Sequence, residues 1–466
     1  MHGPQTNARS GSGVLGGRSV PETLTGGTAL GPPHDGDGRF ANWSRTVTSR
    51  PVVWHEPKSE EEIAAVVRDA STAKQRLRVV GGGHSWSAIA APEEIGVSLD
   101  RWSGIDGETP GTVTARAGTR LRDLNAELAE RGLALPILGS ITRQSIAGAI
   151  ATGTHGSSLV HGNLASLVEG MRLLTGSGEE LELAAGDERL EGARVHLGAL
   201  GAVTHLTLRV VPAFRLAQVV EGVAVGEVAS RLEAIGRSAE FVKVWWLPHT
   251  PLAYIYRCER TDEPTSRRPT PEAERWFEER IMHGLVLPVT LAAHRWHPAM
   301  IPAWNRAMMR TFLQKPRRVG PSVAMLTTPM PVRHRETEAV VPLATAGEAF
   351  DRLVHLIDTE GVRVNFIVEL RFVRGDDGWL SPAQGGDVVQ LGAYAGQTPE
   401  VDRYFAEFWR QMRMLGARPH WGKEMDHDAE EIRALYPLAP RFEALRDELD
   451  PDRVFTNEFL DRVLGS

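Results

Sequence analysis

Residues able to support chemistry gather first at a loop near residue 84, where three consecutive glycines precede a histidine. The loop reads Gly81-Gly82-Gly83-His84-Ser85 and follows an apolar run at 77–80 that predicts a strand. Glycine lacks a Cβ, so the backbone N–H groups of such a loop can approach a diphosphate closely, and positive φ is allowed. The spacing is that of neither a Walker loop nor a Rossmann fingerprint, and a plain tight turn is the alternative interpretation.

Two further segments of small residues follow in the same part of the chain. One extends over 139–157 and contains the runs 145–149 and 152–157, and the other covers 198–203 and leads into a strand expected at 205–211. Two glycine-rich loops in one domain suggest that a single extended ligand lies between them.

A carboxylate and a guanidinium stand two residues apart in the alternating run 366–372. Glu369 and Arg371 therefore project from the same face of an expected strand, and their apolar neighbours form the other face. An exposed polar face is the ordinary interpretation of this pattern. Lys423, in the loop that follows His420, would likewise be an ordinary solvated lysine if the loop stood alone.

Taken together, these motifs resemble the vanillyl-alcohol-oxidase-like flavoproteins and, within them, the aldonolactone and alditol oxidases. The resemblance extends from about residue 42 to 465, and its most specific part is the last motif, in which six consecutive residues agree. The motifs that carry it are Gly81-Gly82-Gly83-His84-Ser85, Gln144-Ser145-Ile146-Ala147-Gly148-Ala149, Thr152-Gly153-Thr154-His155-Gly156 and Arg418-Pro419-His420-Trp421-Gly422-Lys423.

The resemblance implies FAD bound covalently, with the imidazole of His84 joined to the flavin 8α-methyl group. A histidine that only hydrogen-bonds the flavin is the alternative. It also implies an acid–base set over the flavin, formed by Glu369, Arg371 and Lys423, with Ser145 near flavin and substrate; Ser145 could instead cap a short helix. The remaining cofactor contacts that it implies are Gly81, Gly82, Gly83, Ser85, Ser140, Gly148, Thr152, Gly153, Thr154, His155, Gly156, Val203 and His420.

The chemistry implied by this family is oxidation of a CH–OH group in a sugar-derived lactone or polyol by hydride transfer to the flavin. Arg371 and Lys423 would hold the substrate oxygens, and Glu369 would accept hydrogen bonds or serve as the base. O2 is the expected acceptor, giving H2O2. The alternatives are a dehydrogenase with a non-oxygen acceptor, an oxidase of an amino or glycosidic sugar, and a flavin-binding protein without activity.

Three segments of the chain depart from these relatives. Many carry Arg-Glu-Met-Glu-Tyr where this chain has Arg335-Glu336-Thr337-Glu338-Ala339, a change that alters either core packing or the pocket wall. The run 388–394 lacks a His and a Thr that alditol oxidases have on the corresponding strand. Their absence weakens the interpretation that the substrate is an open-chain polyol. The acidic run 424–428 could favour a cationic substrate or simply be surface.

The elements that must position these residues predict an α+β fold. We expect a flexible tail at 1–40, a two-subdomain PCMH-type FAD-binding domain at 41–214 and a substrate (cap) domain with an antiparallel sheet at 215–420. A C-terminal segment, 421–466, is expected to return to the FAD domain and complete the site. In detail, Thr119 should cap a helix, the runs 323–327 and 362–372 are strand-like, and 272–286 is helical.

Composition excludes several other classes of protein. The net charge of −7 argues against sequence-independent nucleic-acid binding. The single cysteine, Cys258, rules out an internal disulfide and a Cys-rich zinc site, and we expect it to be a small packed residue. We expect no metal, no membrane span and no secretory signal, so a cytoplasmic location is the default expectation. The oligomeric state is not predictable from these features.

Overall fold

Two sheets with different strand directions form the N-terminal half of the chain in the computed structural model, which describes residues 34, 37–266, 287–312, 316–328, 332–396 and 398–465. A parallel sheet has the order β3 (Val53–His55), β5 (Ile95–Ser98), β4 (Leu77–Val80). An antiparallel sheet has the order β10 (Glu180–Ala184), β9 (Val168–Leu174), β11 (Ala202–Arg209), β7 (Thr112–Arg116), β6 (Ile105–Thr109).

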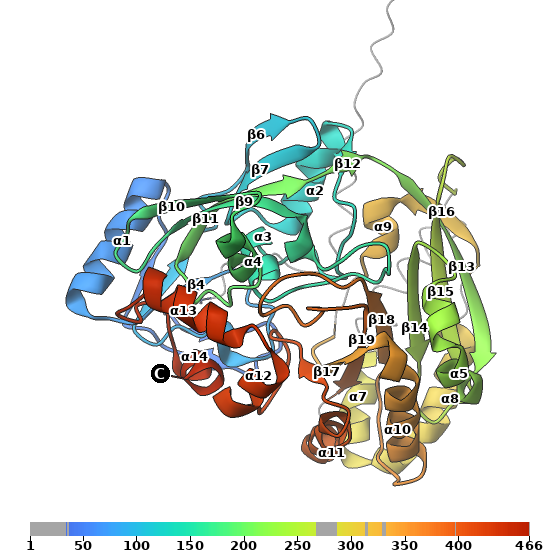
Figure 1. Cartoon of the computed structure of the whole chain (residues 1–466). Coiled ribbons are helices and arrows are strands. Elements are labelled where there is room, and N and C mark those ends of the chain that lie inside the picture. The colour runs from blue at the N-terminus through green and yellow to red at the C-terminus, as the bar shows by residue number, and fades with distance from the viewer. Residues whose placement is uncertain are drawn as a thin grey trace, which may run out of the picture.

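Short helices and strand pairs complete this half of the molecule (Figure 1). Ser59 caps the N-terminus of α1 by accepting a hydrogen bond from the Glu62 backbone. The remaining elements of this half are α1 (Glu60–Ala73), α2 (Leu121–Glu130), α3 (Ile146–Ala151), α4 (Glu188–Arg194), η2 (Ala88–Ala90), η3 (Leu164–Leu167), and the pairs β1 (Phe40–Ala41) with β2 (Thr48–Ser49) and β8 (Leu133–Ala134) with β12 (Val211–Pro212).

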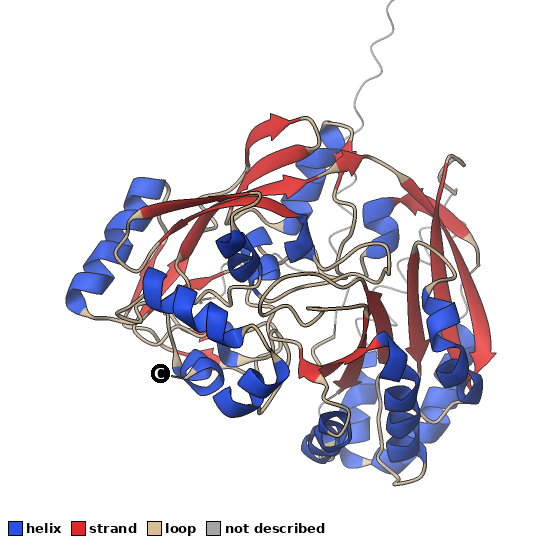
Figure 2. Cartoon of the chain, viewed as in Figure 1, coloured by secondary structure: helices blue, strands red, loops and turns tan. Residues whose placement is uncertain are grey.

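An antiparallel sheet of eight described strands dominates the second half. Its order is β16 (Arg318–Pro321), β13 (Arg215–Ala224), β15 (Leu252–Thr261), β14 (Phe241–Trp246), β18 (Val368–Val373), β19 (Val388–Ala395), β17 (Arg335–Pro342), β20 (Arg418–Pro419). Figure 2 shows helices packed along this sheet. Its own hydrophobic core joins the sheet to α5 (Val225–Gly236), α10 (Ala346–Asp358) and α11 (Val401–Arg413). This sheet and its helices are called the cap below.

The last residues of the chain return to the first core. The helices α12 (Ala429–Leu435), α13 (Ala439–Leu449) and α14 (Glu458–Leu464) lie beside the N-terminal sheets (Figure 1). Phe442, Phe455 and Leu460 are buried in the same cluster as the side chains of α1 and β4. The backbone N–H of Leu77 also donates to the carbonyl of Val454 at 2.7 Å. The chain segment that carries Lys423 is thereby fixed between the two cores.

The structure confirms the α+β class with an antiparallel cap sheet and corrects three local predictions. Residues 323–326 of the run 323–327 lie in helix α9 (Ser322–Leu326), and the strand expected over 362–372 covers only Val368–Val373. Arg120, not Thr119, precedes helix α2, since the Thr119 hydroxyl bonds the carbonyl of Arg116. Other described helices are α7 (Leu287–Trp296), α8 (Ile301–Phe312), η5 (Pro298–Met300) and η6 (Leu343–Thr345).

Several other predictions concern residues at the margins of the described chain. The tail expected at 1–40 falls mostly outside the described residues, as does the helix expected at 272–286. The predicted domain limits remain predictions. None of the described helices is long and apolar enough to cross a membrane. Cys258 is buried on β15, where it accepts a hydrogen bond from Gln218, as a packed residue would.

Candidate active site

Strand register assembles a polar row on one face of the cap sheet. Trp245 on β14 pairs with Glu369 on β18, which pairs with Gly392 on β19, which in turn pairs with Glu338 on β17. Directly paired residues share a face of the sheet, and alternation places residues two apart on that same face. Four strands thus deliver charged and aromatic side chains to one surface, while the opposite face packs against the cap helices.

Glu369 and Arg371 meet as the two-residue spacing predicts. Their closest atoms, Oε2 and Nη2, are 2.8 Å apart, and Glu369 is only 2% exposed. The carboxylate also accepts hydrogen bonds from Trp245 Nε1 at 2.6 Å and the Tyr394 hydroxyl at 2.8 Å. Burial on its own would raise the pKa of Glu369, but the charges of Arg371 and Lys243 and the hydrogen bonds from Arg371 and Trp245 outweigh it and hold the pKa at about 2.

Arg371 joins the cap to the loops of the N-terminal half. Its Nη2 donates to the Ser140 hydroxyl at 2.7 Å, and its Nη1 lies 3.5 Å from the carbonyl oxygen of His155. The planar guanidinium therefore has fixed partners on both sides. Glu369 holds the guanidinium from the cap sheet, and the loops that carry Ser140 and His155 hold it from the N-terminal half. The guanidinium therefore lies at the boundary between the cap and these loops.

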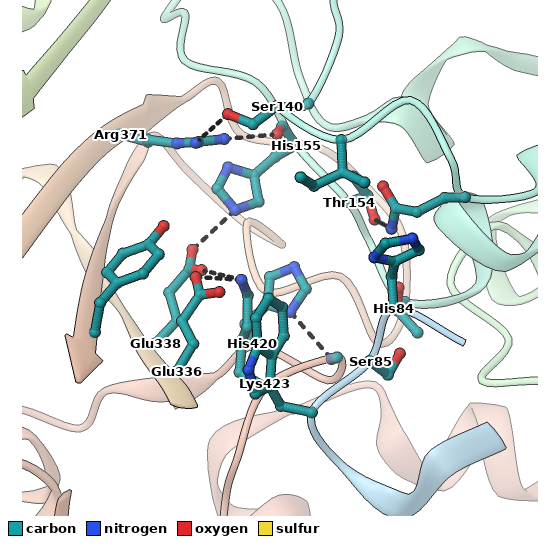
Figure 3. A pocket seen from close by; sticks show the side chains of 17 residues that line it. His84, Ser85, Ser140, Thr154, His155, Glu336, Glu338, Arg371, His420 and Lys423 are labelled. Carbon is teal, nitrogen blue, oxygen red and sulfur yellow. Dashed lines mark hydrogen bonds and ion pairs between the residues drawn. The ribbon is translucent and has the colours of Figure 1, made fainter. Parts of the chain in front are cut away.

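A second charged cluster faces Arg371 across the cavity in Figure 3. Lys423 forms an ion pair with Glu336, and its Nζ is 3.6 Å from an oxygen of Glu338. Glu336 and Glu338 are 1% and 4% exposed. The other oxygen of Glu338 is 2.8 Å from His155 Nε2. Two buried carboxylates, one ammonium and one imidazole thus share one wall.

The glycine loop packs directly on the second small-residue segment. A Cβ on Gly81 would lie 2.2 Å from the Ser145 hydroxyl oxygen, and one on Gly82 would lie 2.7 Å from the carbonyl oxygen of Arg143. Gly83 has φ +64°, where side chains are strained. The backbone N–H groups of residues 82–85 donate no hydrogen bond to any described residue. Such free donors beside a close backbone approach fit the phosphates and polar ring edge of FAD.

Two histidines of the site are held in their neutral form. Burial, reinforced by the charges of Arg120 and Arg143, lowers the pKa of His84 to about 4. Burial also lowers the pKa of His420 to about 3, and its Nδ1 accepts a hydrogen bond from the Gly422 N–H at 3.0 Å. A neutral imidazole has a free electron pair on one nitrogen, which both covalent attachment and hydrogen-bond acceptance require.

Most of these groups line one pocket at the boundary between the cap and the N-terminal loops. Of the residues expected at the site, those lining it are His84, Ser85, Ser140, Thr152, Thr154, His155, Arg371, His420 and Lys423. Those expected at the site but not among its lining residues are Gly81, Gly82, Gly83, Ser145, Gly148, Gly153, Gly156, Val203 and Glu369.

Several of the expected residues that do not line the cavity shape the surrounding backbone instead. Ser145 caps α3, its hydroxyl accepting from the Gly148 N–H at 3.3 Å, which is the structural role weighed for it from the sequence. A Cβ on Gly156 would lie 2.6 Å from the carbonyl oxygen of Leu138. Val203 is buried in β11. Their expected roles in cofactor binding or catalysis remain proposals.

Comparison with known proteins decides the family. The chain matches the family described as D-arabinono-1,4-lactone oxidase over residues 206–463 and the FAD binding domain family over residues 51–184. It is 33% identical to an L-gulono-1,4-lactone dehydrogenase of Mycobacterium tuberculosis, covering 91% of this chain and 99% of that protein. The chain belongs to the D-arabinono-1,4-lactone oxidase family.

Other similarities agree with membership of this family. The chain is 33% identical to an alditol oxidase of a Streptomyces species and 30% identical to an L-gulonolactone oxidase of Scyliorhinus torazame, each over 91% of this chain and 98% of the relative. A crystal structure of cholesterol oxidase from B. sterolicum superposes with a TM-score of 0.79 at 19% identity, covering 94% of this chain and all of that one. That likeness confirms the PCMH-type fold. The chain is an FAD-dependent oxidoreductase.

The departure at 335–339 from other family members falls on the far side of strand β17. Thr337 is fully buried, accepts a hydrogen bond from Trp409 Nε1 of α11 at 2.8 Å, and donates to the carbonyl of Glu424 at 2.6 Å. Ala339 is buried in the cap core. Of the two explanations open from the sequence, the change therefore affects core packing, and the two glutamates remain at the cavity.

The other two departures also have a place in the structure. In the run 388–394, Tyr394 reaches the cavity and bonds Glu369. In the acidic run 424–428, Glu424 pairs with Arg335 at 2.6 Å and Asp428 caps α12. This run therefore serves the surface and the local fold, and it does not form a cavity wall that would favour a cationic substrate.

Sequence reasoning missed part of the cavity wall. The missed lining residues are Trp86, Gly139, Ile141, Gln144, Glu336, Glu338, Tyr394 and Gly422. The one available signal was the alternation of Glu336 and Glu338 within an otherwise apolar strand. A pair of acids on a strand beside buried valines predicts either an exposed face or a buried charged site, and the neighbouring strands decide between these two outcomes.

Gly392 leaves room for the tyrosine that orients the ion pair. A Cβ at this position would lie 2.7 Å from the Tyr394 ring, so Gly392→Ala should displace the ring and break its hydrogen bond to Glu369. We expect a loss of about 1–3 kcal/mol in stability from overpacking, measured by chemical denaturation. Gly386→Ala is the matched control, because no atom lies within 4 Å of its Cβ position. Equal stability of the two variants would contradict this packing.

Proposed function

We propose that the enzyme oxidises a CH–OH group of a sugar-derived 1,4-lactone or polyol and passes the electrons to O2, forming H2O2. The observation that carries the proposal is the placement of two cations, Arg371 and Lys423, on one cavity that also contains the loop of His84. Neutral hydroxylated substrates offer oxygens that both cations can hold. The names of the relatives, which act on lactones and alditols, support this substrate class.

FAD would be held by the loops that this cavity separates from the cap. The free N–H groups of residues 82–85 and the hydroxyls of Thr152 and Thr154 are the candidate contacts. His84 is proposed to form the covalent bond to the flavin, since burial keeps its imidazole neutral and therefore nucleophilic. His420, which directly follows β20 and has a neutral ring, is proposed as a further flavin contact.

The covalent link has a direct test. Acid precipitation of the purified enzyme should leave the yellow flavin in the pellet, and a tryptic peptide containing His84 should carry the mass of FAD. The variant His84→Ala should release its flavin into the supernatant. His355→Ala, which changes an exposed histidine of α10, should behave like the wild type. Free flavin released from the wild-type protein would refute the link.

The residues of the cavity would act mainly by positioning. When bound, FAD supplies the hydride acceptor. Arg371 and Lys423 would bind oxygens of the substrate and stabilise negative charge on the reacting oxygen. Glu369 would fix Arg371 in orientation. The aromatic wall of Trp86 and Tyr394 would exclude water from this side, which strengthens the electrostatic interactions of the bound substrate.

Anaerobic reduction of the flavin by a panel of aldonolactones, alditols and sugars is the experiment that tests the function. Bleaching by a lactone or an alditol is expected, and failure of the whole panel would overturn the proposal. The second candidate is a dehydrogenase with a non-oxygen acceptor, favoured by the name of the Mycobacterium relative. Peroxide formation measured against dye reduction separates the two. The cytoplasmic location expected from the sequence remains a prediction.

A further inference from the structure

Three buried glutamates lie in or just behind the cavity wall, and their hydrogen bonds distinguish them. Glu369 already accepts from Arg371, Trp245 and Tyr394, and it does not line the cavity. A carboxylate that accepts hydrogen bonds from three donors is poorly suited to take a proton. Protonation would leave one of these buried donors without an acceptor, and burial excludes the water that could take its place. Glu369 is therefore best placed to orient Arg371.

Glu338 lines the cavity but is also engaged. Its Oε1 is 2.8 Å from His155 Nε2, and the other ring nitrogen of His155 is 2.9 Å from the carbonyl oxygen of Gly156. Both nitrogens of this ring face oxygen acceptors, so one proton must lie between the imidazole and Glu338. Oε1 of Glu338 is thus engaged by His155, and its Oε2 lies 3.6 Å from the Lys423 ammonium.

Glu336 is the remaining carboxylate of the cavity wall. Its Oε1 is in direct contact with the ammonium of Lys423, so this oxygen is already occupied. Its Oε2 lies 3.8 Å from His334 Nε2. No described residue donates a hydrogen bond to Oε2, so this is the oxygen of Glu336 that a substrate hydroxyl in the cavity can approach.

His334 offers a second acceptor behind Glu336. Its Nδ1 is 2.8 Å from the carbonyl oxygen of Val332, and because a carbonyl oxygen can only accept, Nδ1 carries a proton. Its Nε2 has no hydrogen-bond partner among the described residues. The ring is buried among the aromatic rings of Trp43, Trp86, Phe366 and Tyr394. The Nε2 atom therefore has Oε2 of Glu336, 3.8 Å away, as its polar neighbour, and aromatic rings surround the rest of the imidazole.

We propose that Glu336 is the proton acceptor of the reaction and that His334 is the group to which it passes the proton. This inference rests on the proposed function. The substrate C–H bond breaks and its hydrogen and electron pair go to FAD, while the O–H bond breaks and its proton goes to Glu336. The products are a carbonyl compound, reduced FAD and the protonated Glu336. The proton then moves to His334 Nε2, and Lys423 as an ammonium ion compensates the carboxylate charge before and after.

The test compares three isosteric variants in anaerobic single turnovers. Glu336→Gln should lower the rate of flavin reduction at least 100-fold, in the range of about 10²–10⁴ for loss of a general base. Glu338→Gln is the matched control, since it lies on the same strand and also contacts Lys423. It and Glu369→Gln should retain the solvent deuterium isotope effect of the wild type, which Glu336→Gln should lose. The truncated Glu336→Ala should regain rate with added formate.

Infrared spectroscopy provides a readout that a structural role of Glu336 would not move. During reduction of the wild-type enzyme by substrate, time-resolved spectra should show a transient carboxylic-acid band, present until the proton reaches His334, that shifts in D2O and is absent from Glu336→Gln. If the band disappears from Glu369→Gln instead, or formate fails to rescue Glu336→Ala while both variants remain folded, the proposal is overturned. Wild-type enzyme that no lactone, alditol or sugar reduces would overturn the proposed function itself.

Discussion

Replacing Lys423 by alanine is expected to lower the rate of flavin reduction by substrate about 1,000-fold while leaving FAD bound. The side chain reaches the cavity from the loop after β20, at 16% exposure, and its ammonium is held by Glu336, by Glu338 and by the ring of Trp86, whose centroid is 4.4 Å from Nζ. A charge fixed on both sides needs no reorganisation when negative charge develops on a substrate oxygen. Removal of one such donor typically costs about 10²–10³ in rate.

Loss of this lysine also leaves two buried carboxylates without their shared cation, which adds to the expected effect. Stopped-flow reduction at saturating substrate, with flavin content checked by absorbance, is the measurement. Lys423→Arg should retain more of the rate than Lys423→Ala, and Lys58→Ala, at an exposed lysine, should match the wild type. Near-normal reduction of Lys423→Ala by the substrate that reduces the wild type would remove Lys423 from the site.

Much of the site could be predicted from the sequence because it depends on local pattern. A two-residue spacing is enough to place Glu369 and Arg371 on one face of a strand, whatever the strand packs against. Three glycines before His84 likewise predict that another chain segment packs closely against this backbone, and the contacts of Gly81 and Gly82 confirm it. These features survive in a single sequence because neighbouring residues determine them.

The rest of the site depends on strand register, which no local pattern reveals. Glu338 reaches the row of Glu369 only because β17 pairs with β19 in one register, and a shift of one residue would turn both glutamates of β17 into the cap core. The change from Met and Tyr to Thr337 and Ala339 could not be assigned to a side of the strand for the same reason. The run 323–327 is short and apolar, a pattern shared by buried strands and buried helices, and its Ala, Met and Leu residues are good helix formers.

Replacing Arg371 by methionine is expected to reduce the stability of the folded protein by about 3–5 kcal/mol at neutral pH, because it removes the only cation in direct contact with the buried Glu369 among the described residues and leaves only the more weakly coupled charge of Lys243. Met keeps much of the volume of the side chain, so packing is largely retained. Trp245 and Tyr394 still donate to the carboxylate, but neither carries a charge. The double variant Arg371→Met/Glu369→Gln should recover most of the loss, since the neutral amide oxygen can still accept a hydrogen bond.

The dependence of this loss on pH identifies its origin. In the wild type the pKa of Glu369 is held at about 2, below the value of about 4.3 in an unfolded chain, so its stabilising contribution is complete above pH ~4.3 and disappears as pH falls toward 2. Without Arg371 the folded-state pKa rises, and less stability is lost on acidification. The difference between wild type and Arg371→Met should therefore shrink below pH ~4, as measured by chemical denaturation across this range. A difference that stays constant with pH, or a double variant no more stable than Arg371→Met, would show that the guanidinium acts by packing and not by compensating Glu369.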